Sequence, residues 1–202
     1  MNQHLTSLGG VLQRLRDNSR GVTVIEYALI SPVFLTLLMG GMDVAQEAYA
    51  LSLLNGATQK IARADTIQNA NTSTNNATVL QTLAPVLPNV TVNSVRQNYN
   101  DFADIGRSEK WNDTNNNGLC DNGETYVDEN SDGHFSTDVA ESGNGGANDV
   151  VVWTVTATYR PMFYAPFVSR IAGTRTLKSV AIKKNQPFAA QTPYNNATGI
   201  CA

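Results

Sequence analysis

Residues 20–42 read RGVTVIEYALISPVFLTLLMGGM, and they form the only run in this 202-residue chain that is long and apolar enough to cross a bilayer. A hydrocarbon core about 30 Å thick takes roughly 20 helical residues, and Val22 to Met42 supplies 21. We therefore expect a transmembrane helix over 22–42. One acid, Glu26, lies inside it. A carboxylate there costs roughly 2.5 to 3.5 kcal/mol to insert, so Glu26 is a candidate functional residue that needs a cationic partner.

The segment before this run suggests the source of that cation. Its charges are mostly basic: Arg14, Arg16 and Arg20 against Asp17. Such a bias keeps a leader in the cytoplasm. If a peptidase cut between Gly21 and Val22, the new α-amino group would carry a positive charge on the first residue of a helix whose fifth residue is Glu26. In an assembly of parallel copies, this amine could meet Glu26 of a neighbour.

Two other interpretations of the segment stay open at the level of sequence. The first is a secretory signal peptide cleaved at Ala48-Tyr49-Ala50, although that would need an apolar stretch far longer than the usual 7 to 15 or so residues. The second is an uncleaved signal anchor whose Glu26 snorkels to the cytoplasmic headgroups. Glu26 is only five residues into the segment, so its depth does not distinguish an anchor from a processed leader.

The boundary motif, Gly21 followed by four residues and then Glu26-Tyr27, resembles the leaders of prepilins, in particular those of the tight-adherence (Tad) pilus. The order of elements and the closing run 183–188, KKNQPF, resemble the TadE-type minor pseudopilins, although Gln186 stands where that family often has Glu. The resemblance implies cleavage after Gly21 by a prepilin peptidase and assembly with other pilins through the helix. It implies a single-pass protein of the bacterial inner membrane, with a cytoplasmic N-terminus and a periplasmic C-terminal domain, or incorporation into an extracellular pilus.

The helical pattern continues beyond the membrane run. Leu54, Ala57, Ile61 and Ala64 recur every three or four residues, which predicts an amphipathic stalk helix over 43–67. Residues 68–78 are rich in Asn, Thr, Ser and Ala and lack periodicity, so we expect a linker or cap there. Residues 79–83 predict a short helical turn that ends before two prolines.

The remainder, 68–202, is expected to form a periplasmic or extracellular domain with a small antiparallel sheet. Residues 90–95 alternate as a strand, 150–159 are rich in β-branched and aromatic residues, and 174–182 alternate again. Between the last two strands lies an aromatic loop with Phe163, Tyr164 and Phe167, which could fill the core or present a partner surface. A sheet leaning on a long helix is an α+β plan.

Charge is concentrated in one insertion, residues 101–149. This segment holds 12 of the 17 acidic residues and only two basic ones, Arg107 and Lys110. Such a segment repels nucleic acid and anionic lipid and attracts cations. The remaining lysines and arginines are scattered, so no basic patch indicates DNA or RNA binding.

The insertion contains a predicted calcium loop, residues 113–124. Its sequence, DTNNNGLCDNGE, fits the pattern D-x-[DN]-x-[DN]-G-x₅-E at every fixed position. In such a loop one Ca²⁺ is bound by side-chain oxygens, a backbone carbonyl and both oxygens of the final Glu. The expected ligands are Asp113, Asn115, Asn117, the carbonyl of Leu119, Asp121 and Glu124. Neither flank predicts a helix, so a true helix-loop-helix is not expected.

A second loop, residues 128–138, repeats the D-x-N-x-D-G core. Its expected ligands are Asp128, Asn130, Asp132, the carbonyl of His134, Ser136 and Asp138. Val139 occupies the twelfth position, so closure would fall to Asp138 or Glu141. Tandem loops of this kind resemble those of dockerins and thrombospondin-type repeats in loop chemistry only. The alternative is a hydrated insertion of residues that favour turns.

The remaining reactive side chains do not indicate an enzyme. His4 lies in the leader and His134 in the second loop, and the chain has no G-x-S-x-G or P-loop motif. Cys120 and Cys201 form no metal or redox motif. In an oxidising compartment they could form one disulfide, and two unpaired thiols are the alternative. The sequence therefore predicts a structural pilus subunit with a calcium-stabilised domain, and a membrane-anchored calcium-dependent adhesin is the competing hypothesis.

Overall fold

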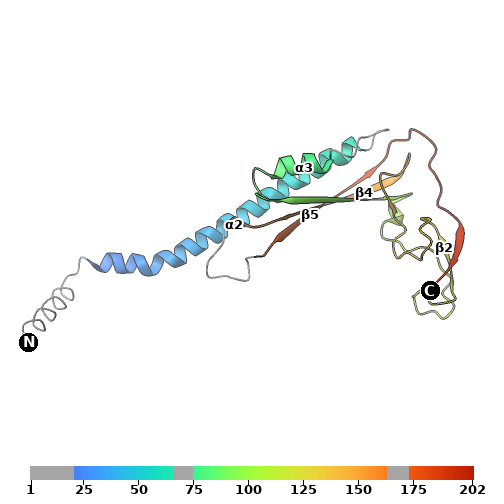
Figure 1. Ribbon diagram of the computed structural model, residues 1–202, viewed down its shortest axis with the longest axis horizontal. Coiled ribbons are helices and arrows are strands. Elements are labelled where there is room, and N and C mark those ends of the chain that lie inside the picture. The colour runs from blue at the N-terminus through green and yellow to red at the C-terminus, as the bar shows by residue number, and fades with distance from the viewer. Residues whose placement is uncertain (1–20, 66–74, 163–172) are drawn as a thin grey trace, which may run out of the picture.

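The computed structural model describes residues 21–65, 75–162 and 173–202. It confirms an α+β fold, in which one long N-terminal helix is followed by an antiparallel sheet domain (Figure 1). In chain order the elements are the helices α2 (Val22–Ala64) and α3 (Asn75–Leu83), the strand β1 (Thr91–Tyr99), the short 3-10 helix η2 (Phe102–Asp104), and the strands β2 (Thr125–Asp128), β3 (Glu141–Ser142), β4 (Val150–Tyr159), β5 (Arg175–Lys184) and β6 (Ala197–Ile200).

Helix α2 unites the expected membrane segment and stalk in a single element of 43 residues. Pro32 lies inside it, and the hydroxyl of Thr36 donates to the Pro32 carbonyl at 2.7 Å. An 18-residue window of α2 has a mean hydropathy of 1.9 and is not buried at all by the rest of the chain. A core helix of a soluble protein would be covered, so this part of α2 has the length, composition and exposure of a membrane-spanning helix.

The main sheet has the strand order β3-β1-β4-β5, and all its pairings are antiparallel. The central strand β4 aligns Val155 with Ser94 of β1 on one side and with Ser179 of β5 on the other. Successive residues of a strand point to opposite faces. Accordingly, Trp153 and Val155 lie in the hydrophobic core with the other odd-numbered residues of β4 from 151 to 159.

The core lies between this sheet and the C-terminal half of α2, with α3 alongside. The predicted stripe is buried at Leu54, Ala57 and Ile61, but Ala64 is exposed and Asp65 is buried instead. Helical geometry explains this correction. At about 100° per residue, position 65 returns to within roughly 20° of Leu54, whereas position 64 points about 80° away.

The predicted linker is partly helical, because α3 begins at Asn75 rather than at Val79. Asn75 is buried, and its side-chain amide donates to the Asp65 carboxylate at 2.8 Å. This contact with Asp65 fixes the first residue of α3 within a polar segment. The periodicity of the segment itself could not indicate it. Residues 66–74 and the aromatic residues Phe163, Tyr164 and Phe167 lie outside the described residues.

An ion-pair clamp joins the sheet to α2 immediately after the apolar run. The Arg175 guanidinium, on β5, lies 2.6 Å from the Asp43 carboxylate and 2.8 Å from that of Glu47. Asp43 is the first buried residue of α2. One turn on, the Gln46 amide donates to the Val86 carbonyl at 2.6 Å. The sheet domain therefore contacts the helix directly at the end of the expected membrane span.

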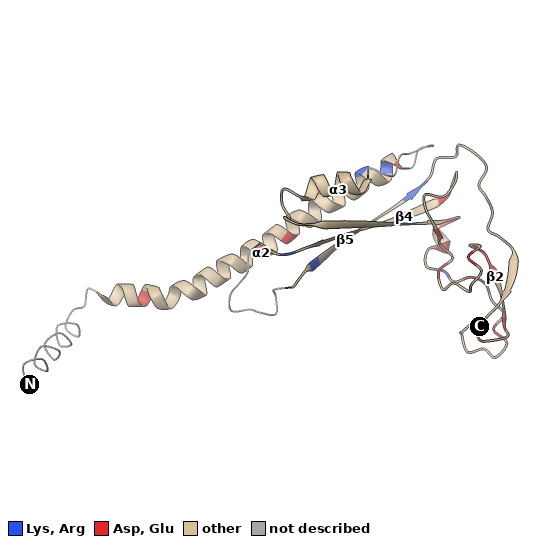
Figure 2. Ribbon diagram, viewed as in Figure 1, with Lys and Arg blue, Asp and Glu red and all other residues tan. Residues whose placement is uncertain are grey.

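A second, smaller lobe contains most of the insertion and the C-terminal segment, far along the molecule from the apolar end of α2 (Figure 1). It includes the two-stranded sheet β2-β6, and many of the positions occupied by Asp and Glu lie in this part of the ribbon (Figure 2). A small apolar cluster of Tyr99, Val139 and Val152 attaches this lobe to the main sheet. The acidic insertion is thus a folded part of the domain.

Replacing Leu54 tests the helix-sheet core. Leu54 is fully buried, so Leu54→Ala should lower the free energy of unfolding by about 2 to 5 kcal/mol through lost burial and a residual cavity. Leu51→Ala is the matched control, because Leu51 is 36% exposed and should change stability by less than about 0.5 kcal/mol. Denaturant unfolding of the full chain in detergent measures both. Equal effects of the two substitutions would contradict this packing.

Candidate functional site

The N-terminal end of α2 carries the first candidate site, the expected cleavage and assembly residues. Gly21 is the N-cap, with φ −90° and ψ −11°, and it makes no side-chain cap. A Cβ atom added at Gly21 would meet nothing within 4 Å. The fold therefore does not require glycine here, since neither the backbone conformation nor packing demands it.

Glu26 and its neighbours are likewise exposed on the surface of α2. Glu26 is exposed, Val22 is 49% exposed and Tyr27 is 72% exposed. Among the described residues, no ion pair involves Glu26. An acid on an apolar helix with no ion-pair partner in the described part of its chain is available to a partner from outside.

The first predicted calcium loop has a regular backbone conformation that its own side chains hold. The Asp113 carboxylate accepts from the backbone N–H groups of Asn117, at 3.1 Å, and Gly118, at 2.8 Å. The Asn115 side chain also accepts from Asn117 N–H at 3.0 Å. Asn116 and Gly118 both have positive φ, 57° and 77°. The backbone thus turns tightly around side-chain oxygens, as the loop sequence predicts.

The second loop repeats this conformation position by position. Asp128 accepts from the N–H groups of Asp132 and Gly133, each at 3.1 Å, and Asn130 accepts from Asp132 at 3.1 Å. Ser131 and Gly133 have φ values of 61° and 78°. The fourth and sixth positions are therefore left-handed in both loops, although the fourth residue is Asn in one and Ser in the other.

Two acids of the first loop are held in their charged form. The Asn115 and Asn117 amides donate to the Asp121 carboxylate at 2.8 and 2.6 Å, and these contacts lower the pKa of Asp121. The Asp121 N–H donates to Glu124 at 3.1 Å and lowers the pKa of Glu124, with help from Thr114. Charged carboxylates at these places favour a cation.

The second loop has a similar arrangement with different closing residues. Burial opposes ionisation of Asp132, but hydrogen bonds from the His134 N–H and the Ser136 hydroxyl lower its pKa. The His134 side chain is exposed. Asp138 is engaged elsewhere, since it accepts from the Tyr99 hydroxyl at 3.0 Å.

Glu141, the other acid expected to close the second loop, belongs to β3, and burial followed by the nearby Asp149 raises its pKa. The structure therefore places Glu141 in the main sheet and Asp138 against Tyr99.

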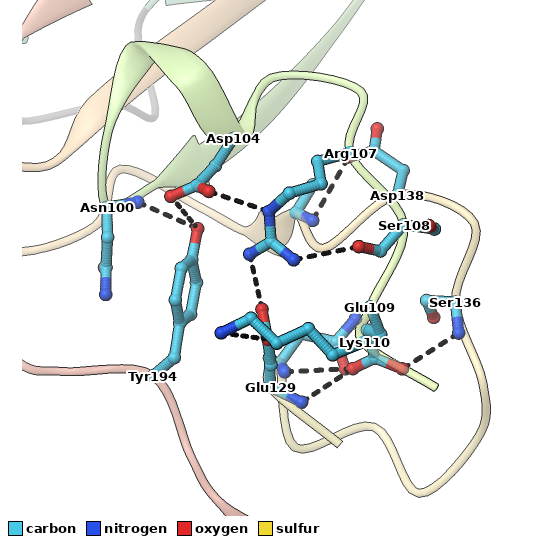
Figure 3. A network of polar contacts seen from close by, with 12 residues as sticks. Asn100, Asp104, Arg107, Ser108, Glu109, Lys110, Glu129, Ser136, Asp138 and Tyr194 are labelled. Carbon is cyan, nitrogen blue, oxygen red and sulfur yellow. Dashed lines mark hydrogen bonds and ion pairs between the residues drawn. The ribbon is translucent and has the colours of Figure 1, made fainter. Parts of the chain in front are cut away.

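Two residues of this lobe, Arg107 and Glu109, carry no site prediction from the sequence. Figure 3 shows Arg107 between three partners: it contacts Asp104 at 2.8 Å, forms an ion pair with Glu129, and lies over the ring of Tyr194. Glu109 is fully buried and accepts from three backbone N–H groups of the second loop. Single charged residues outside a motif carry no periodic or spacing signal, so only the fold could reveal them.

A disulfide joins Cys120, the eighth residue of the first loop, to Cys201 just after β6. Backbone hydrogen bonds flank it: the Gly123 N–H donates to the Cys201 carbonyl at 3.2 Å, and the Cys201 N–H donates to the Glu124 carbonyl at 2.8 Å. A bridge that closes a loop of 81 residues lowers the entropy of the unfolded chain, which stabilises the fold by about 4.5 kcal/mol in the loop-entropy model. The C-terminal tail is therefore fastened to the first loop.

His, Cys, Asp and Glu side chains alone form no group of three or more that could hold a metal within the described residues. The two loops offer a different ligand set, in which carboxylates alternate with amide, hydroxyl and backbone carbonyl oxygens. Such oxygen ligands suit Ca²⁺ rather than a transition metal. The loops remain a predicted site.

One protein-family model matches the helix. The model of the TadE-like protein family matches residues 21–63. The N-terminal helix is TadE-like. No curated protein and no solved structure matches the chain.

The TadE-like segment begins at Gly21 and ends one residue before the end of α2. It thus contains the whole apolar run, the Glu26-Tyr27 pair, and Asp43 and Glu47 of the clamp. The match covers 43 of the 202 residues and is consistent with a protein related to the Tad pilus. The sheet and both acidic loops lie outside the match.

The lowered pKa values of Asp121 and Glu124 predict acid sensitivity of the first loop. Their usual values are 3.8 and 4.5. A lowered folded-state pKa contributes stability that is fully present above the unfolded value and is lost as the pH falls through the folded value. The melting temperature in EDTA should therefore fall from about pH 5 downward. In the double variant Asp121→Asn, Glu124→Gln this decline should be shallower, and an unchanged pH profile would contradict the assignment.

Proposed function

We propose that this chain is a minor pilin of a Tad-type pilus, processed after Gly21 and assembled through its TadE-like helix. One observation supports this most directly: the helix is TadE-like, and from Val22 to Met42 it is uncovered by the rest of the chain. An apolar surface of that length needs lipid or other apolar helices around it. A pilin helix meets both, first in the membrane and then in the filament.

Processing would explain why Gly21 is glycine. Packing and backbone conformation leave the position unrestricted, since a Cβ there meets nothing within 4 Å. A peptidase that must bring the backbone of Gly21 close to its catalytic groups would impose the missing restriction. The leader peptidase is the proposed partner for this step.

Glu26 would then be neutralised by assembly. Cleavage creates an α-amino group on Val22, and Glu26 has no ion-pair partner among the described residues of its own chain. In a bundle of parallel helices the amine of one copy can reach Glu26 of another. The charge pair would be desolvated, so its loss would leave an unpaired acid among apolar helices.

The sheet domain would project from this bundle, with calcium stabilising its far lobe. The two loops share the same backbone conformation, and their segment carries ten more acidic than basic residues. Two Ca²⁺ would remove four of those charges and reduce repulsion within the lobe. Outside the cytoplasm, calcium is plentiful enough for weak sites of this class.

Substitution of Gly21 tests the processing step. Gly21→Leu should leave a precursor that retains residues 1–21, because the bulky side chain would block close approach of the peptidase. Intact mass of the membrane-extracted protein measures the start residue. Gly40→Leu is the matched control, since its Cβ also meets nothing within 4 Å, and it should be processed normally. A mature-sized Gly21→Leu protein would refute the proposed cleavage site.

Calcium binding is tested on the oxidised full chain in detergent. Titration with CaCl₂ should release or absorb heat and raise the melting temperature relative to EDTA, because the ion binds only the folded loops. Glu124→Gln should reduce both effects, and Glu47→Gln, on helix α2, should change neither. If Ca²⁺ leaves the melting temperature of the unsubstituted chain unchanged, the metal part of the proposal is wrong while the pilin assignment stands.

A further inference from the structure

We infer that Glu109 supplies the closing carboxylate of the second loop from outside the loop, in the role that Glu124 has in the first. This inference rests on the proposed calcium binding. It concerns the identity of the closing ligand, for which sequence spacing offers Asp138 or Glu141. The geometry, the charge balance and the packing around Glu109 all support it.

The loop itself offers no closing acid. Its twelfth residue, Val139, is fully buried in the apolar cluster with Tyr99 and Val152. Asp138 turns toward Tyr99, and Glu141 lies in β3. The place of the closing carboxylate must therefore be filled from another segment or remain without an acid.

Glu109 fills that place with the contacts that Glu124 makes in its own loop. In the first loop, one Glu124 oxygen accepts from the N–H of the second residue, Thr114, at 2.7 Å, and the other accepts from that of the ninth residue, Asp121, at 3.1 Å. In the second loop, one Glu109 oxygen accepts from the second residue, Glu129, at 2.7 Å, and the other from the ninth, Ser136, at 3.0 Å. Figure 3 shows the Glu109 carboxylate between these two parts of the loop.

The charge balance is a separate observation that points to a cation. The lobe has three buried glutamates, of which Glu129 is neutralised by Arg107 and Lys110. Glu109 is 0% exposed and Glu124 is 4% exposed, and neither forms an ion pair with a basic side chain among the described residues. Backbone N–H groups satisfy hydrogen bonds but add no formal charge, and a buried unpaired charge is costly. Glu109 and Glu124 occupy the two closing places. Asp149, the fourth buried acid of the insertion, also forms no ion pair among the described residues and accepts from the Gly146 N–H and the Gln191 amide instead.

Neighbouring backbone contacts hold Glu109 at the loop. Its N–H donates to the Ser136 carbonyl at 3.0 Å, and the carbonyl of Lys110 accepts from Val127 N–H at 2.8 Å. Trp111 continues this pairing through an isolated bridge to Tyr126. The segment therefore runs between β2 and the end of the second loop and holds Glu109 against the loop's backbone N–H groups.

The resulting ligand set is divided between two segments: Asp128, Asn130, Asp132, the His134 carbonyl and Ser136 from the loop, with Glu109 from the preceding segment. Such a site forms only when that segment is docked. Calcium bound there would stabilise the contact between the two segments. In a loop closed by its own twelfth residue, calcium would stabilise that loop alone.

The experiment isolates the second loop in a Glu124→Gln background of the oxidised full chain in detergent. Calorimetry with CaCl₂ should find two sites in the unsubstituted chain, one in Glu124→Gln, one in Glu109→Gln and none in the double variant. Glu141→Gln is the control and should keep both sites. A purely structural Glu109 would lower the melting temperature equally in EDTA and in calcium. A ligand should instead abolish the calcium-induced rise in the Glu124→Gln background.

The outcomes separate this inference from the proposed function. If the unsubstituted chain binds no calcium, both fail. If Glu109→Gln keeps two sites, or if the unsubstituted chain has one site that Glu124→Gln removes, only the role of Glu109 is refuted. Should Glu109→Gln fail to fold, Glu109→Asp retains the charge but shortens its reach. It should weaken the second site by at least about tenfold, and unchanged affinity would overturn the inference.

Discussion

The structure depends on one constraint: a single continuous helix must serve two environments. The first half of α2 is apolar on all sides and uncovered, whereas its second half buries one face against the sheet through Leu54 and Ile61. The change occurs at Asp43, whose buried carboxylate forms an ion pair with Arg175. The clamp therefore holds the sheet domain at a fixed place along α2, directly after the apolar run.

In this arrangement the helix and the sheet domain have different roles. The TadE-like helix carries the features expected for assembly, while the sheet domain projects the acidic lobe away from the helix's apolar end (Figures 1 and 2). The lobe is fastened in three ways: the apolar cluster at Tyr99, the Arg107 ion pairs and the Cys120–Cys201 bridge. A projecting lobe with ten excess negative charges needs such fastening, because self-repulsion opposes its compaction.

Sequence reasoning succeeded where a signal is local and periodic. The apolar run, the stripe through Leu54 and the β-branched strand at 150–159 each follow from residue spacing alone, and the structure confirms the α+β plan that they imply. It was less successful where pairing is non-local. The strands β2, β3 and β6 have four residues or fewer and mixed polarity, so their identity depends on the partner strand rather than on their own sequence. The helical start at Asn75 depends in the same way on Asp65.

The sequence by itself determined the anchor helix, the resemblance to TadE-like proteins and the repeated loop pattern, because each is encoded by residues close together in the chain. Only the tertiary structure decided which distant groups meet: Arg175 with Asp43, Cys120 with Cys201, and Glu109 with the second loop. The physical reason is that a buried charge selects its partners by position in space. Glu109 precedes the loop by 19 residues and shares no spacing with it, yet folding places its carboxylate on the loop's backbone N–H groups.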